Sequence, residues 1–222
     1  MKTLAILSRK GGAGKTTLTV HLAVAADQTG AAVAVFDLDP QASAAVWGDR
    51  RDGQTPAIVA AQAPRLPALL AQARAQEAEL IILDTAPHAD SIAAEAAAHA
   101  DAVLIPCRPS AFDLDAIGAS VKLAQAAGKP VYVIINAAPP IGPEADEMRA
   151  ALGAAGVLVC PVVIHQRKAF ATFIQEGKTA IEGEPKSKAA KEIRDLLRWA
   201  CEQVNFLPSE QGKKLSAMRK AR

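Results

Sequence analysis

The fold of this chain is decided by one short stretch near its N-terminus, Lys10-Gly11-Gly12-Ala13-Gly14-Lys15-Thr16-Thr17. The stretch matches the phosphate-binding loop pattern G-x-x-x-x-G-K-[ST] except at the first position, where Arg9 replaces glycine. Lys10 adds a second lysine, five residues before Lys15. One such lysine normally serves the phosphates of one nucleotide, so Lys10 is either idle or reaches a different nucleotide.

The loop lies between a predicted strand and a predicted helix. Residues 2–8 read KTLAILS, a short apolar run, and residues 15–28 read KTTLTVHLAVAADQ, with apolar residues at helical spacing. A glycine-rich turn before a helix directs backbone N–H groups and the helix N-terminus at an anion. We therefore expect Lys15 to neutralise phosphate charge and Thr16 to ligate Mg²⁺. A glycine-rich turn without chemistry is the alternative, which so many matching positions disfavour.

Length and composition indicate one domain of 1–206, followed by a basic, flexible tail of 207–222. No apolar run approaches the ~18 residues of a membrane span, and no secretory leader is evident. Cys107, Cys160 and Cys201 are widely spaced and odd in number, which favours reduced thiols in a cytoplasmic protein.

Apolar runs alternate with helical patterns along the chain. Strands are predicted at 4–7, 32–36, 80–83, 102–106, 130–135 and 158–164, with a weaker one at 57–60. Helices are predicted at 15–28, 41–50, 65–76, 90–99, 114–127, 144–155 and 187–204. Continuously apolar strands are typical of a sheet that helices cover on both faces. We expect an α/β fold, a doubly wound and mostly parallel sheet of the P-loop NTPase class, with ligands at the carboxyl ends of the strands.

Carboxylates follow two of these strands. Asp84 comes after four apolar residues, at the tip of a buried strand, where a carboxylate would hold Mg²⁺. Asp37 and Asp39 alternate along the end of another strand, so one can face the γ-phosphate and the other the metal. Asp39 precedes Pro40 and can instead be a turn residue.

Together these motifs resemble the deviant-Walker-A ATPases of the ParA/MinD family, and most closely its short ParA-type members without an N-terminal DNA-binding domain. The resemblance rests on the loop of residues 10–17, on Asp-Leu-Asp-Pro-Gln at 37–41 and on Asp-Thr-Ala-Pro at 84–87. It implies that Lys10 crosses an ATP-sandwich dimer to the partner's nucleotide. It also implies that Thr17 contacts the α-phosphate.

The resemblance assigns further roles at the strand ends. It implies that Asp37 orients the hydrolytic water, that Asp39 lies near the metal or switch I, and that Asp84 is the Walker B aspartate. Residues 85–91 match switch II, but Ala86-Pro87-His88 departs from the Pro-Pro of many relatives. Asn136 follows a strand in the region that approaches adenine in similar proteins, and either reads the base or closes a turn.

Positive charge gathers near the C-terminus. Residues 1–164 contain 12 basic and 16 acidic residues, whereas residues 165–222 contain 13 basic and 7 acidic residues. The family carries a similar basic segment after its last strand, where the dimer binds DNA without reading sequence. The candidates here are Arg167, Lys168, Lys186, Lys188, Lys191, Arg194 and Arg198. An ordinary solvated helix face is the alternative.

From these features we expect a Mg²⁺-dependent ATPase that dimerises on ATP, binds nonspecific DNA and positions a plasmid, chromosome or protein organelle. A ParB-like or adaptor partner would stimulate hydrolysis, and the protein would be cytoplasmic and nucleoid-associated. A MinD-like membrane-cycling regulator is the alternative, but the tail offers only Leu215 and Met218 as larger apolar residues. A nitrogenase-iron-protein-like reductase would need paired cluster cysteines, which Cys107 and Cys160 do not supply convincingly.

Overall fold

The structure is a computed structural model that describes residues 1–51, 53 and 55–207; the tail predicted at 207–222 lies, from residue 208 onward, outside the described residues. Six parallel strands form one sheet in the order β3-β2-β4-β1-β5-β6. They are β1 (Lys2–Ile6), β2 (Val33–Asp37), β3 (Ala57–Ala60), β4 (Leu80–Asp84), β5 (Ala102–Cys107) and β6 (Val131–Ile135). The doubly wound α/β prediction is confirmed, and the described sheet is parallel throughout.

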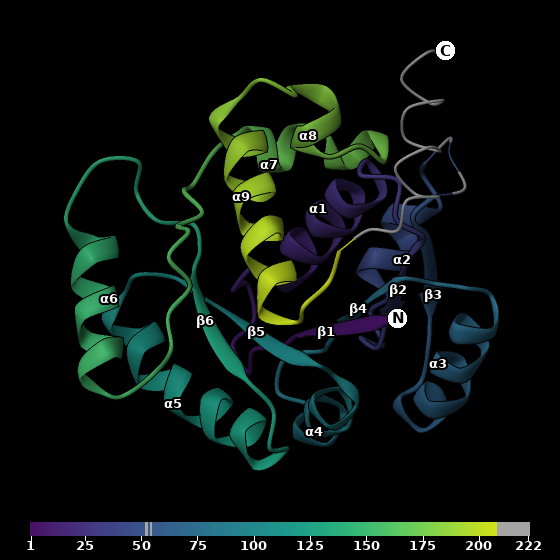
Figure 1. Cartoon of the computed structure of the whole chain (residues 1–222). Helices are drawn as coiled ribbons and strands as arrows, with labels where there is room; N and C mark the ends of the chain where they lie inside the picture. The colour runs from purple at the N-terminus through teal and green to yellow at the C-terminus, as the bar shows by residue number, and fades with distance from the viewer. Residues whose placement is uncertain (52, 54, 208–222) are drawn as a thin grey trace.

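Helices cover both faces of the sheet (Figure 1). One face packs against α1 (Lys15–Asp27), α2 (Ser43–Gly48), α7 (Ala169–Thr172), α8 (Ala180–Gly183) and α9 (Lys188–Gln203). The other packs against α3 (Leu66–Ala75), α4 (Asp90–His99), α5 (Ala111–Ala126) and α6 (Glu144–Ala154). Single 3₁₀ turns lie at Ala63–Arg65 and Ile174–Glu176. None of the helices within the described ranges is long and apolar enough to span a membrane.

The strand patterns follow from this two-sided packing. Every residue of β4 and β5 is buried, which is why these strands read as unbroken apolar runs. Helix α9 buries Ile193, Leu196 and Leu197 against α1 and the sheet. Its apolar face is therefore part of the core.

One predicted strand is wrong. The run at 158–164 forms only one isolated bridge with β6, from Val159 to Val133, and a second bridge, from His165 to Ala138, lies just beyond both segments. Pro161 lies in the middle of the run and has no N–H to donate to a ladder. Leu158 is 59% exposed, so this apolar run is not a strand that helices cover on both faces.

The strand order places the polar residues of the motifs at one edge. β4 lies between β1 and β2, and its register sets Asp84 beside Ile6 of β1 and Asp37 of β2. The loop that leaves β1 leads directly into α1. The phosphate loop and both strand-end carboxylates therefore meet at the carboxyl edge of the sheet.

Candidate nucleotide-binding site at the carboxyl edge of the sheet

Two glycines shape the phosphate loop. Gly12 has φ 72° and Gly14 has φ 96°, in the left-handed region that favours glycine. Gly14 caps α1, which begins at Lys15 and runs for 13 residues. The free N–H groups of its first turn and its dipole therefore point into the loop, as an anion site requires.

Lys15 lies inside this loop. Only 7% of the residue is exposed, and its Nζ lies 3.5 Å from the Lys10 carbonyl oxygen. Burial lowers the pKa of Lys15, and the nearby Asp84 and Asp39 carboxylates partly oppose that shift. The ammonium group is thus held at the helix N-terminus beside negative charge, where a phosphate would compensate its burial.

Asp84 is the most deeply buried carboxylate of the site. It is fully buried, and although the Thr16 and Thr19 hydroxyls lie near it, neither of its carboxylate oxygens makes a hydrogen bond of standard geometry among the described residues. Burial raises the pKa of Asp84 to about 7, although the hydroxyls of Thr16 and Thr19 and the charge of Lys15 act to lower it. Two orphaned oxygens beside the Thr16 hydroxyl fit a divalent cation, which would relieve their desolvation.

The protein supplies only part of such a cation site. Within the described ranges, no group of three or more His, Cys, Asp or Glu side chains has metal-ligand geometry. This fits Mg²⁺, which is usually bound by one or two protein oxygens together with water and substrate phosphates. Cys107 and Cys160 are both buried, and burial raises the pKa of the Cys160 thiol to about 12.

Asp37 and Asp39 are tied to their own backbone. Asp37 accepts the N–H groups of Ala44 at 2.8 Å and Ala45 at 3.1 Å, so it caps the start of α2. Its other oxygen accepts the N–H of Asp39 at 3.1 Å. Burial raises the pKa of Asp37, and these hydrogen bonds oppose the shift. Sequence reasoning missed this capping role because the acceptor precedes the helix by several residues.

Asp39 forms the turn that its place before proline also predicted. Its Oδ1 accepts the N–H of Gln41 at 2.9 Å, and the residue is half-buried. The structure thus brings Thr16 and Asp84 close together, whereas the Asp39 carboxylate is bonded to its own turn. A metal contact from Asp39 stays a prediction.

Asn136 contacts the phosphate loop, and a contact from Asn136 to the base stays a prediction. Its Nδ2 donates to the Ala13 carbonyl at 2.7 Å, and 7% of the residue is exposed. A Cβ at Gly14 would lie 2.3 Å from the same nitrogen. Asn136 therefore supports the phosphate loop from behind, and that support requires glycine at position 14.

Arg9 links the loop to the switch II segment. Its Nε lies 3.0 Å from an oxygen of Asp90, and its carbonyl accepts the N–H of His88 at 3.2 Å. His88 has φ 55°, a left-handed conformation. The missing first glycine of the motif was the signal for this contact, because a side chain there can reach a neighbouring segment.

The predicted basic surface is partly neutralised. Arg167 donates to Glu192 through Nε at 3.1 Å and Nη2 at 2.6 Å, and the His165 ring contacts the same carboxylate at 2.9 Å. The Arg167 side chain is only 22% exposed. An internal carboxylate therefore already pairs with the Arg167 guanidinium, and a contact between Arg167 and a DNA phosphate stays a prediction.

The other cations divide into two groups. Lys191 and Arg198 both pair with Asp195, and Arg194 donates to the Pro185 carbonyl at 2.7 Å. Lys168, Lys186 and Lys188 are exposed and make no ion pair within the part of the chain that the structure describes. The first turns of α7, α8 and α9 contact one another through Ala169, Ala180 and Ala189. The three unpaired lysines therefore flank one small cluster of helix ends.

Comparison with known proteins shows similarity over most of the chain. Residues 4–180 match the model of the CobQ/CobB/MinD/ParA nucleotide binding domain. The chain is 27% identical, over 205 residues, to the maintenance of carboxysome distribution protein A of Halothiobacillus neapolitanus, covering 88% of this chain and 94% of that protein.

Solved structures share the fold at lower identity. MinD of Pyrococcus horikoshii OT3 complexed with Mg-ADP gives a TM-score of 0.71 at 20% identity, over 90% of this chain and 95% of that one. A McdA–ATP complex from Cyanothece gives 0.71 at 16% identity, over 95% and 99%. The family match spans most of the chain and contains the phosphate loop, Asp37, Asp84 and Asn136. The protein therefore belongs to the CobQ/CobB/MinD/ParA family of nucleotide-binding domains.

Proposed function

We propose that this protein is a Mg²⁺-dependent ATPase that dimerises on ATP and positions a large cargo with a partner protein. The observation that carries the proposal is the meeting of Lys15, Thr16 and the orphaned Asp84 carboxylate at the N-terminus of α1. Such a constellation suits a nucleotide triphosphate with its metal. Relatives of the same fold were solved with Mg-ADP and with ATP.

Each residue has a task in this proposal. The N–H groups of residues 11–17 and the Lys15 ammonium bind the phosphates, while Thr16 and Asp84 hold Mg²⁺. The metal, when bound, neutralises charge that develops on the phosphate oxygens. Asp37 orients the attacking water by accepting its proton in a hydrogen bond. The N–H groups of Ala44 and Ala45 fix the direction of that carboxylate.

Dimerisation is proposed from Lys10. It opens the loop on the same edge as the nucleotide, and its carbonyl lies beside Lys15. In the face-to-face dimer that the ParA/MinD resemblance implies, each Lys10 completes the site of the other subunit. Turnover is then slow in the monomer, because each site lacks one cation.

The proposed cargo is taken from the relative whose alignment covers 88% of this chain and 94% of its own. That relative is named for carboxysome distribution, so a protein organelle is the first cargo to test. DNA would be the surface along which the cargo is positioned, and it would bind at Lys168, Lys186 and Lys188. Arg167, Lys191 and Arg194 would contribute less, because each already bonds to another group of the chain. A MinD-like membrane cycle gains no support from α9, because its apolar face lies in the core.

ATP hydrolysis and light scattering after gel filtration test the proposal together. We expect the wild type to hydrolyse ATP with Mg²⁺ and to elute as a dimer when hydrolysis is blocked by Asp37→Ala. Adding Lys10→Ala to that variant should return the protein to a monomer, whereas Lys122→Ala, an exposed lysine on α5, should not. A Lys10→Ala protein that still dimerised as readily would overturn the dimer role.

A further inference from the structure

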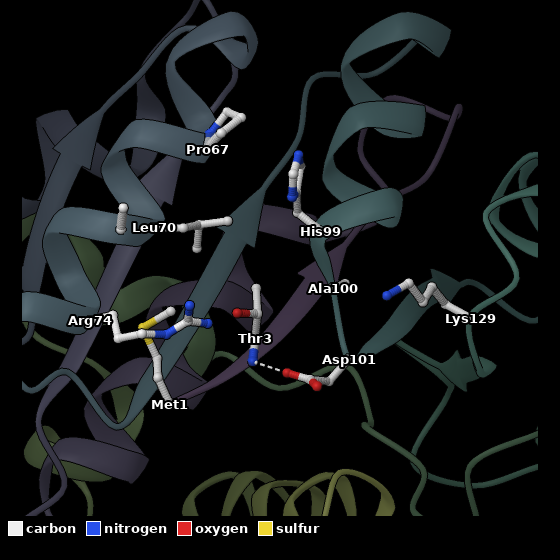
Figure 2. A pocket seen from close by; sticks show the side chains of 10 residues that line it. Met1, Thr3, Pro67, Leu70, Arg74, His99, Ala100, Asp101 and Lys129 are labelled. Carbon is white, nitrogen blue, oxygen red and sulfur yellow. Dashed lines mark hydrogen bonds between the residues drawn. The ribbon is translucent and has the colours of Figure 1, made fainter.

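A second cavity opens at the other edge of the sheet, where the strands begin. Figure 2 shows it between α3, the end of α4 and the start of β1. Its volume is about 320 Å³, at the lower end of the range for small-molecule pockets. The residues that line it are Met1, Thr3, Pro67, Leu70, Ala71, Arg74, His99, Ala100, Asp101 and Lys129.

Three basic residues of this cavity lie at the C-terminal ends of three consecutive helices. Arg74 lies in the last turn of α3, His99 in the last turn of α4, and Lys129 just after α5. Neither the Arg74 guanidinium nor the Lys129 ammonium makes a hydrogen bond or ion pair with any part of the chain that the structure describes. The His99 ring contacts Glu95 at 3.1 Å.

The helix dipoles explain why cations are tolerated there. The negative C-terminal ends of α3 and α4 stabilise a basic residue in their last turns by roughly 0.3–1 kcal/mol each. The dipoles do not supply hydrogen-bond acceptors for the Arg74 guanidinium, which is exposed, or for the Lys129 ammonium, which is half-buried. A bound anion can replace the water that solvates these two groups.

The acidic residue of the cavity is already engaged. Asp101 is the one carboxylate among the lining residues, and its Oδ2 accepts the Thr3 N–H at 2.7 Å. Its Oδ1 lies 3.8 Å from the Lys2 ammonium. Its charge is thus directed at the start of β1 and at a lysine outside the cavity, which leaves Arg74 and Lys129 uncompensated.

The floor and one wall complete the site. Thr3 is 4% exposed, and its hydroxyl makes no hydrogen bond within the described ranges, so it can bond a ligand oxygen. Pro67, Leu70 and Ala71 give the α3 side an apolar surface (Figure 2). The combination of cations, a free hydroxyl and an apolar wall suits an anionic head group on a small apolar body.

We infer that this cavity is a second ligand site, for a small phosphate monoester whose phosphate lies between Arg74, Lys129 and the Thr3 hydroxyl. A dianionic phosphate offers three acceptor oxygens, one for each of these donors. The apolar body packs on Leu70. The site lies at the opposite edge of the sheet from the phosphate loop and does not depend on the function proposed above.

Proton NMR of the histidine rings tests the site with phenyl phosphate as the probe. Because His99 lines the cavity and His88 adjoins the phosphate loop, the two rings report the two sites separately. We expect saturable shifts at His99. Arg74→Ala and Lys129→Ala should each weaken binding about tenfold, as loss of a charge-assisted hydrogen bond does. The exposed Lys122→Ala should leave the binding unchanged.

Further probes define the ligand class. Inorganic phosphate should bind more weakly than phenyl phosphate in the wild type, and Leu70→Ala should abolish that difference. Benzoate binding as tightly as phenyl phosphate would overturn the assignment to a phosphate group. Shifts at His88 without shifts at His99, or equal affinity in the folded Arg74→Ala, Lys129→Ala double variant, would overturn the site itself.

Discussion

At the scale of single residues, the phosphate loop depends on a hydrogen bond between a side chain and a backbone carbonyl that are far apart in the sequence. The Asn136 amide reaches the Ala13 carbonyl across the space that a side chain at position 14 would fill. Gly14→Ala should therefore displace Asn136 and strain a backbone with φ 96°. We expect nucleotide binding to be lost, with a drop of roughly 1–3 kcal/mol in the free energy of unfolding, measured by calorimetric ADP titration and urea denaturation.

A double-mutant cycle separates the two causes. Asn136→Ala alone leaves the Ala13 carbonyl unpaired, at a cost of about 1–3 kcal/mol. Combined with Gly14→Ala it removes the overlap but not the left-handed φ, so the double variant should be less unstable than the sum of the two single variants. Strictly additive losses would show that Asn136 and Gly14 do not interfere.

Asp84 illustrates a conflict between stability and function. A buried carboxylate whose oxygens make no hydrogen bond of standard geometry destabilises the protein when no cation is bound. Asp84→Asn should abolish ATP hydrolysis and yet raise the free energy of unfolding of the nucleotide-free protein by roughly 1–3 kcal/mol. Mg²⁺ with ADP should stabilise the wild type more than this variant. Melting curves with and without Mg-ADP measure both effects, and a less stable nucleotide-free variant would contradict the argument.

At the scale of the elements, one histidine joins the nucleotide helix to the C-terminal helices. His21 of α1 contacts the Thr17 carbonyl through Nδ1 at 2.7 Å and accepts the Ala180 N–H at Nε2 at 3.1 Å. Since Nε2 accepts, the proton of the neutral ring is on Nδ1. The ring also packs edge-on against Phe170, with centroids 5.1 Å apart. Sequence reasoning missed this link, because His21 lies within an apolar helical pattern.

The link predicts sensitivity to acid. Burial lowers the pKa of His21 to about 4 in the folded protein, while the Thr17 hydrogen bond and the Glu182 charge oppose the shift. Between pH 6.5 and pH 4 the unfolded chain therefore binds a proton that the folded chain does not, so stability falls as the pH falls through this window. The total loss from His21 is about 3 kcal/mol, and none of it is present above pH 7.

Urea denaturation from pH 7.5 to 4 checks this effect. His21→Leu should be less stable than the wild type at pH 7.5, because the Ala180 N–H loses its acceptor. Its deficit should shrink as the pH falls, since the variant has no proton to take up there. His99→Gln, at a half-buried histidine on α4, should retain the decline of the wild type. A constant deficit at all pH values would exclude His21 as the source.

The elements also show what local sequence can and cannot predict. The phosphate loop and the strands that end at Asp37 and Asp84 were predictable, because glycine spacing and apolar runs are local signals. The strand predicted at 158–164 was wrong because an apolar pattern does not show whether a segment pairs along the edge of β6, and Pro161 has no N–H for such pairing. The Arg167–Glu192 pair spans 25 residues and the Asn136–Ala13 bond spans 123, so neither is visible in any local pattern.

At the scale of the whole molecule, two surfaces have to act together in the proposed function. The nucleotide lies at the carboxyl edge of the sheet, while Lys168, Lys186 and Lys188 flank the ends of α7, α8 and α9. His21 joins α1 to α8, which contacts α9, so the two surfaces are connected through packed helices. In the proposed dimer, the three lysines of both subunits would bind one polyanion.

DNA binding should therefore require ATP and fall steeply with salt. Each lost phosphate contact lowers the log–log salt slope by about 0.9, so one lysine exchanged for alanine lowers it by about 1.8 in a dimer. We expect this for Lys168→Ala, Lys186→Ala and Lys188→Ala in the hydrolysis-deficient Asp37→Ala background. Arg167→Ala should change the slope less, because Glu192 already pairs with that guanidinium.

Fluorescence anisotropy with two unrelated duplexes, read from 50 to 300 mM salt, measures these slopes. The exposed Lys122→Ala is the matched control, since it removes a lysine from the opposite face of the sheet. Vesicles with anionic lipids form the second arm. Binding to vesicles but not to DNA would exclude the DNA track and favour the membrane cycle. DNA binding of equal strength with ATP, with ADP and without nucleotide would show that dimerisation does not create the DNA-binding surface.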